Sequence, residues 1–93
     1  MKDRITSKRL KKYHDLRSNA LKIAKESVII GKEIEAKEII EMVSNYLKDA
    51  TYFEKEKDFV NAFAAINYAH GWLDSGVRLD IFKTKNNKLF TVK

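Results

Sequence analysis

The chain of 93 residues contains no cysteine and no proline, and it has only three glycines. The absence of cysteine excludes a disulfide framework, a thiolate metal site and a cysteine nucleophile. The absence of proline removes the residue that most strongly interrupts helices. Three glycines are too few for a glycine-rich phosphate-binding loop. These absences together favour a small helical domain without the common cofactor-binding motifs.

Long apolar runs are also missing. No stretch approaches the roughly 18 apolar residues that a membrane span needs, and no signal-peptide pattern opens the chain. We therefore expect a cytoplasmic protein that does not enter a membrane. A hydrophobic fraction of 44% is ordinary for a globular domain, and the length suffices for one core but not for two.

Basic residues outnumber acidic ones by 19 to 13, and the resulting net charge of +6 is unevenly distributed. Residues 1–27 carry nine basic and three acidic side chains, residues 28–76 carry five and nine, and residues 77–93 carry five and one. Basic patches are typical of nucleic-acid binding. Oppositely charged helices can also pack together and neutralise each other, and this second interpretation is the one we favour.

Apolar residues recur at spacings of three and four along most of the chain, which predicts helices. The pattern indicates one helix over residues 3–29, a second over residues 34–56, and a third that follows Asp58 and ends near Gly76. Gly31 is expected to stop the first helix, since glycine adopts positive φ without strain. Asp58 is expected to cap the first turn of the third helix with its carboxylate.

Short connections between the helices imply antiparallel neighbours. The sequence therefore predicts an all-α fold, an up-and-down antiparallel three-helix bundle over residues 1–80, followed by a short basic tail over residues 81–93. Short alternating runs around Lys85, Asn86 and Asn87 are consistent with a small hairpin in this tail. A loosely ordered basic tail fits the same residues, and both interpretations remain open.

The third helix has an unusual composition, rich in small and aromatic residues from Asn61 to Gly76. Gly71 lies in its middle at a cost of about 1 kcal/mol relative to alanine, which close approach of another helix or a ligand would offset. Ala65, Tyr68 and Trp72 lie outside the main apolar face. A helix this apolar is central in its fold or touches something else as well.

His70 and Asp74 stand four residues apart and are therefore neighbours on a helix, with Asn67 on the same side. A carboxylate beside an imidazole can fix its tautomer and raise its pKa, as catalytic and metal-binding histidines often require. A buried hydrogen-bond network of the three residues is the alternative, and it carries more weight because His70 falls on the apolar face.

Motifs for catalysis or cofactor binding are absent. The two histidines, His14 and His70, lack metal-site spacing, and no nucleophile elbow or Walker loop occurs. We expect His14 to be solvated. We therefore predict no cofactor, no metal and no catalytic residue, and we favour a protein that is not an enzyme.

Three runs of residues carry a family resemblance. They are Asp-Ala-Thr-Tyr-Phe at residues 49–53, Asn-Ala-Phe-Ala at residues 61–64 and, most specifically, Tyr-Ala-His-Gly-Trp-Leu-Asp at residues 68–74. The chain thereby resembles an archaeal family known only as domain of unknown function 357, mainly over its second and third helices. The resemblance implies a closed three-helix bundle without an assigned activity. Lys57 departs from it, because we expect glycine in the turn between those helices.

The leading hypothesis is a binding or scaffolding module that uses the third helix for self-association, as a homodimer, or for recognition of a protein partner. Its candidate binding residues are Asn67, Tyr68, His70, Trp72 and Asp74.

Two further hypotheses remain. The first is nucleic-acid contact without sequence specificity, through the tail lysines and a basic patch on the first helix that comprises Arg4, Lys8, Lys11 and Lys22. The second is an enzyme in which His70 acts as the acid–base group and Asp74 orients it. The enzyme requires His70 to line an open pocket.

Overall fold

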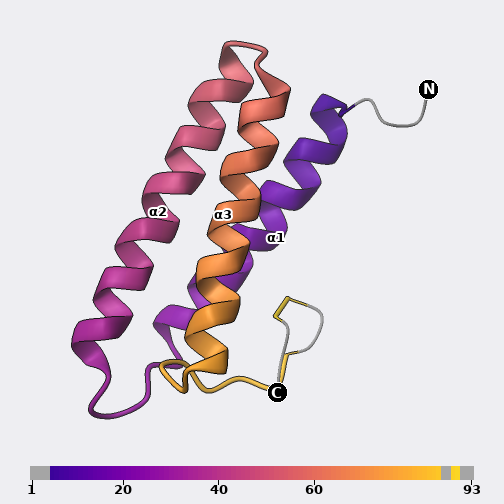
Figure 1. Cartoon of the computed structure of the whole chain (residues 1–93). Coiled ribbons are helices and arrows are strands. Elements are labelled where there is room, and N and C mark those ends of the chain that lie inside the picture. The colour runs from indigo at the N-terminus through magenta and orange to yellow at the C-terminus, as the bar shows by residue number, and fades with distance from the viewer. Residues whose placement is uncertain (1–4, 87–88, 91–93) are drawn as a thin grey trace.

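The computed structural model describes residues 5–86, 89 and 90, which form three helices (Figure 1). They are α1 (Ser7–Lys25), α2 (Glu33–Lys55) and α3 (Phe59–Arg78). The helices run up and down as neighbours, and the described residues contain no regular strand, only an isolated bridge. The predicted all-α three-helix bundle is confirmed. None of the described helices has the length and apolar content that crossing a membrane requires.

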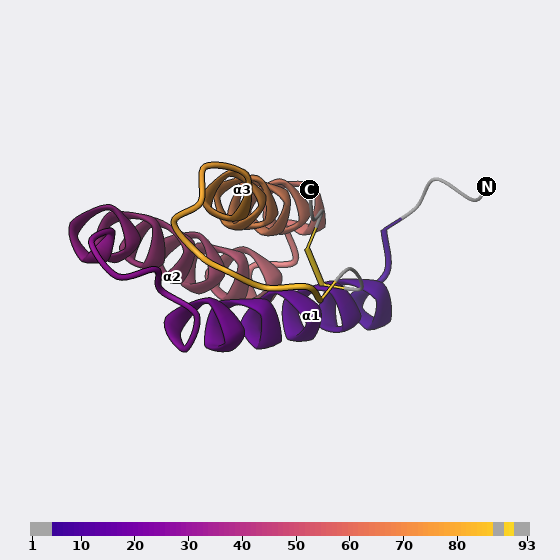
Figure 2. The same cartoon turned by 90° about the horizontal axis from the view of Figure 1, so that it is seen from below.

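The bundle is long and thin, with principal extents of 45 × 22 × 16 Å. The pairing of α2 with α3 is the most extensive, while α1 contacts both of them. Viewed from below, α3 lies above and α1 below, so the upper side of α3 faces away from the other helices (Figure 2).

Two hydrophobic clusters fill the interior. The smaller one is built around Leu10, Ala62, Ala65 and Ile66, near the α2–α3 turn. The larger one combines all three helices with the segment after α3, and it includes Leu21, Val43, Leu73, Phe82 and Phe90. Small alanines at the helix contacts let the backbones approach closely, and burial of the larger side chains supplies the main stabilisation.

The first helix is shorter than predicted, because it ends at Lys25 instead of residue 29. Its expected start falls partly on residues outside the described part, and within that part Thr6 caps the helix by accepting a hydrogen bond from Arg9 N–H at 3.2 Å. After Lys25 the chain extends, and Ile29 N–H donates to the Ile81 carbonyl at 2.9 Å. A run of β-branched residues favours this extended backbone over helix. Gly31 has the expected positive φ of 93°, but it lies in the connection and not at the helix end.

The segment after α3 packs into the core. Phe82 forms an antiparallel bridge with Val28, and Lys83 N–H donates to the Ser27 carbonyl at 2.9 Å. Ile81, Phe82 and Phe90 are all buried. The hairpin, one of the two interpretations that the sequence left open, is not present in the described part of the segment, and its turn would include Asn87, which lies outside the described residues. The ordered contacts also exclude a loose tail as far as Phe82.

The turn between α2 and α3 agrees with the prediction from the sequence. Asp58 caps α3 as predicted, because its carboxylate accepts from Asn61 N–H at 3.2 Å. Lys57 adopts a positive φ of 59°, the conformation for which glycine is the favoured residue. Asp58 N–H donates to the Phe53 carbonyl at 2.8 Å, which satisfies a carbonyl at the end of α2.

The strain at Lys57 is testable. Replacing an L-residue in the left-handed conformation removes a steric cost, so Lys57→Gly should raise the free energy of unfolding by about 1 kcal/mol. Lys48→Gly, at an exposed position in the interior of α2, should lower it by a similar amount. Urea unfolding of both variants checks the prediction, and equal destabilisation by the two would contradict it.

The contact between Gly76 and Phe82 is also testable. A Cβ atom at residue 76 would lie 2.5 Å from two carbons of the Phe82 ring, and that ring is buried. Gly76→Ala should therefore lower the free energy of unfolding by about 1–3 kcal/mol. The control Ser75→Ala, at the exposed neighbouring position, should change it by less than about 0.5 kcal/mol. Unchanged stability of Gly76→Ala would mean that Phe82 is not held against α3.

Candidate functional site

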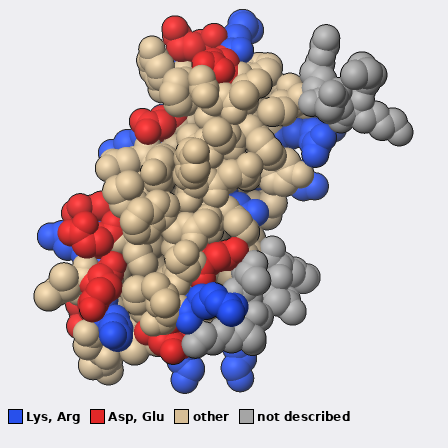
Figure 3. Space-filling model, in the orientation of Figure 1, with Lys and Arg blue, Asp and Glu red and all other residues tan. Residues whose placement is uncertain are grey.

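The outward side of α3 carries most of the predicted binding residues. Helical spacing brings ten positions to this side, which we call the outer α3 face: Val60, Asn61, Ala64, Asn67, Tyr68, Gly71, Trp72, Ser75, Arg78 and Leu79. Tyr68, Val60 and Leu79 are 61%, 73% and 66% exposed, which is high for such large apolar side chains. Figure 3 shows a strip of uncharged atoms along α3, with charged groups gathered at its sides and ends.

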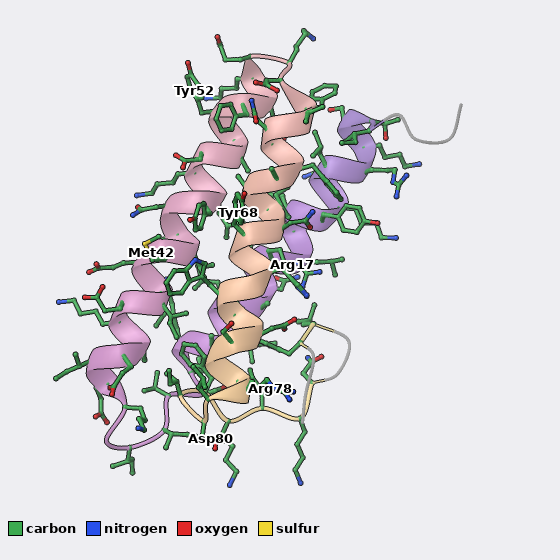
Figure 4. The ribbon with its side chains drawn as sticks, in the orientation of Figure 1. Arg17, Met42, Tyr52, Tyr68, Arg78 and Asp80 are labelled. Atoms are coloured by element: carbon green, nitrogen blue, oxygen red, sulfur yellow. The ribbon has the colours of Figure 1, made fainter. Side chains whose placement is uncertain are left out.

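Two shallow depressions shape the outer α3 face, and Tyr68 borders both. One has a volume of about 360 Å³ and is lined by Asn67, Tyr68, Gly71, Trp72 and Ser75. The other, about 140 Å³, lies between α3 and α2 and is lined by residues that include Ala64 and Tyr68. Tyr68 lies on α3 next to α2 (Figure 4), and its ring centroid is 5.5 Å from that of Tyr46 of α2. The Tyr68 side chain therefore separates the two depressions.

No contact within the bundle explains why residue 71 is a glycine. A Cβ atom at this position would meet nothing within 4 Å, and the residue has ordinary helical backbone without positive φ. Close packing inside the chain therefore does not offset the cost of about 1 kcal/mol that glycine brings to a helix interior.

His70 and Asp74 lie apart from the larger depression, on the side of α3 near α1. His70 Nε2 is 2.8 Å from the Asp74 carboxylate, as the spacing predicted. Arg17 of α1 is the third ionisable group of this cluster, because its charge interacts with both residues. Arg17 also donates to the Leu89 carbonyl at 3.2 Å and thereby ties α1 to the final segment.

The predicted hydrogen-bond network with Asn67 does not form. Asn67 is exposed and lines the depression beside Gly71, while His70 Nδ1 is buried and has no hydrogen-bond partner among the residues that the structure describes. His70 itself is half-buried and not in the centre of the apolar face. Ala65, which the sequence placed with Tyr68 and Trp72 outside the main apolar face, is buried in the core.

The pKa of His70 is lowered, contrary to the effect expected from the carboxylate. Burial disfavours the charged imidazolium, the positive charge of Arg17 acts in the same direction, and Asp74 opposes both. The neutral imidazole then holds its proton on Nε2, facing Asp74. Nδ1, the nitrogen left for acid–base chemistry, has less than 1 Å² of exposed surface. This arrangement supports a structural role for the His70–Asp74 pair. The enzyme hypothesis requires an accessible imidazole nitrogen on His70, and Nδ1 does not provide it.

Two residues have roles that the sequence interpretation missed. His14 is not solvated but half-buried, with Nε2 3.2 Å from the Leu47 carbonyl and 3.3 Å from the Thr51 hydroxyl of α2. Arg17 was not singled out, although its spacing of four residues from Tyr13 places it on the inward side of α1. Both side chains connect α1 to other parts of the bundle.

The basic patch lies partly within the described residues. Lys8, Lys11 and Lys22 are exposed on α1, and Arg4 lies outside the described part. Asp15 interrupts the patch, because its carboxylate is 3.7 Å from Lys11 Nζ. Nucleic-acid binding stays a prediction. Among the described residues, no three His, Asp or Glu side chains come together to hold a metal.

The His70 arrangement predicts a pH dependence of stability. Because the folded state lowers the pKa of His70 below its ordinary value of 6.5, protonation favours the unfolded chain. The free energy of unfolding should therefore fall as the pH decreases through 6.5, and His70→Gln should flatten this part of the profile. His14→Gln keeps His70 and should keep its contribution. Urea unfolding at several pH values tests this, and an unchanged slope in His70→Gln would contradict it.

Comparison with known proteins identifies a family. A family model described as "Protein of unknown function (DUF357)" matches residues 12–82, from early α1 through α3 to Phe82. The match is wider than the resemblance noted in the sequence, since it includes most of α1 and the first residues after α3. No curated protein and no solved structure matches.

Proposed function

Because the chain belongs to the DUF357 family, whose description assigns no activity, we propose a function from its surface: it is a small helical scaffold that self-associates through the outer α3 face. The uncharged strip along α3 is the observation that carries this proposal (Figure 3). No Lys, Arg, Asp or Glu occurs from Phe59 to Leu73. On a chain in which 34% of residues are charged, such a stretch is unusual.

The outer α3 face can receive a second copy with little charge repulsion at the contact. Two copies of a chain with net charge +6 repel each other overall, but Arg78 is the one charged residue of this face, so the contact itself brings few like charges together. A partner with an acidic surface would be attracted to α1 instead, where Lys8, Lys11 and Lys22 are exposed.

The side chains of the face are suited to an interface. Tyr and Trp are enriched where proteins bind, because they bury a large area at a small cost in conformational entropy. Tyr68 is already held in place by Tyr46, so little of its freedom remains to be lost. Gly71 lets a second backbone approach, which supplies the gain that the bundle itself does not provide.

Sedimentation velocity over a wide range of protein concentrations tests the proposal. The wild type should form a dimer, and Trp72→Glu should weaken association by about 30-fold or more, because it buries a charge at the interface. Ile34→Glu introduces the same charge at an 80% exposed position on α2 and should still dimerise.

Trp72 supplies a second readout, since it is the only tryptophan of the chain. Its fluorescence should shift to shorter wavelength as the protein concentration rises, because association removes the indole from water. A wild-type chain that stays monomeric at every concentration, with constant emission, would contradict the proposal.

A further inference from the structure

A pocket of about 560 Å³ lies at the end of the bundle where α3 ends, and it is larger than either depression on the outer α3 face. Three parts of the chain form its wall: the connection between α1 and α2, the end of α3, and the segment after α3. We call it the end pocket, and its lining includes Ile29, Val77, Asp80, Phe82, Lys83 and Lys85. It shares no lining residue with the outer α3 face.

Backbone hydrogen bonds hold the wall of the end pocket in place. Lys83 N–H donates to the Ser27 carbonyl, and Ile29 N–H donates to the Ile81 carbonyl, both at 2.9 Å. Asp80 lies just beyond the end of α3 (Figure 4), and its positive φ of 60° turns the chain back toward the α1–α2 connection. The fold itself therefore builds the pocket, and a ligand need not order a loop in order to enter it.

One side of the end pocket is apolar. Ile29, Val77 and Phe82 form this side, and Val77 and Phe82 also belong to the larger hydrophobic cluster, whose packing holds them. Small-molecule sites are typically concave and mainly apolar, with volumes of roughly 300–1,000 Å³ and a few polar groups that orient the ligand. The end pocket has this form, and it suits a ligand with an apolar body.

The charged groups of the end pocket favour an anion. Lys83 and Lys85 are both exposed, and neither has an ion-pair partner among the residues that the structure describes. Asp80 is the one acidic residue among the described lining residues, and it has an interaction partner of its own. Two ammonium groups against one partnered carboxylate give the pocket a net positive charge, which attracts a negatively charged group.

We propose that the end pocket binds a small apolar carboxylic acid. The apolar chain of the acid lies against Ile29, Val77 and Phe82, and its carboxylate pairs with Lys83 and Lys85. Burial of the chain supplies most of the affinity, and the two lysines select an anionic head over a neutral or cationic one. This binding goes beyond the proposed self-association and does not depend on it.

Titration of the ¹⁵N-labelled protein with octanoate at neutral pH, followed by amide NMR shifts, tests the proposal. The shifts should follow a single saturable curve and should be largest at Ile29 and residues 83–85. Octanol and octylamine carry the same chain with a neutral and a cationic head, and each should bind about fivefold more weakly or less. Shifts that do not saturate, shifts centred on another part of the bundle, or octanol that binds as tightly as octanoate would overturn the proposal.

Charge variants test the role of the two lysines. The double variant Lys83→Gln/Lys85→Gln should raise the Kd of octanoate about fivefold or more and leave that of octanol unchanged. The control Lys12→Gln/Lys48→Gln removes the same charge from exposed positions on α1 and α2, and it should change the Kd of octanoate less than about twofold. Equal weakening by the two double variants would mean that net charge alone attracts the acid, and it would overturn the site.

Two neighbouring isoleucines test the apolar side. Ile29→Ala removes part of the lining and should weaken the binding of octanoate and octanol alike, by about fivefold. Ile30→Ala removes the same side chain from a 94% exposed position outside the lining, and it should leave both affinities unchanged. Circular dichroism verifies that both variants are folded. Equal effects of the two substitutions would point to adsorption on exposed apolar surface and contradict the proposal.

Discussion

The helix α3 touches every other part of the bundle, and its packing sets the position of the rest. One side meets α2 along most of its length, and another meets α1. At its C-terminal end, Gly76 accepts hydrogen bonds from Ile81 and Phe82 N–H through its carbonyl and leaves room for the Phe82 ring. A helix with apolar residues over more than half its circumference needs cover on several sides. The two neighbours and the segment after α3 cover all but the outward side, so the outer α3 face is what this packing leaves open.

The two glycines of α3 show how differently the same residue can act. Gly76 is buried against Phe82 and Ile39, where any side chain would collide with the core. Gly71, five residues earlier, faces open space. The sequence does not distinguish the two, whereas the structure separates a glycine packed against the core from one that faces open space.

Helical spacing was sufficient to predict α2, α3, the Asp58 cap and the His70–Asp74 pair, because each depends on residues within one turn of a helix. The end of α1 was not predictable in this way. It depends on Ile81 and Lys83, which hydrogen-bond to the 27–29 segment from more than fifty residues away. The lowered pKa of His70 has a similar origin, since burial and Arg17 on another helix outweigh the adjacent carboxylate. Local sequence patterns therefore predict the helices. The end of α1 and the pKa of His70 depend on contacts with residues far away in the sequence.

The bond from Arg17 to the Leu89 carbonyl joins residues 72 positions apart, and Phe90 shares one core with Ala20 and Leu21. The bundle is therefore closed by contacts between nearly opposite ends of the described chain. During synthesis, α1 emerges from the ribosome long before the residues that complete its burial. The helices α2 and α3 cover part of its apolar side earlier, but the part that packs against Phe90 stays uncovered until that residue is made, so folding is completed only after synthesis of residue 90.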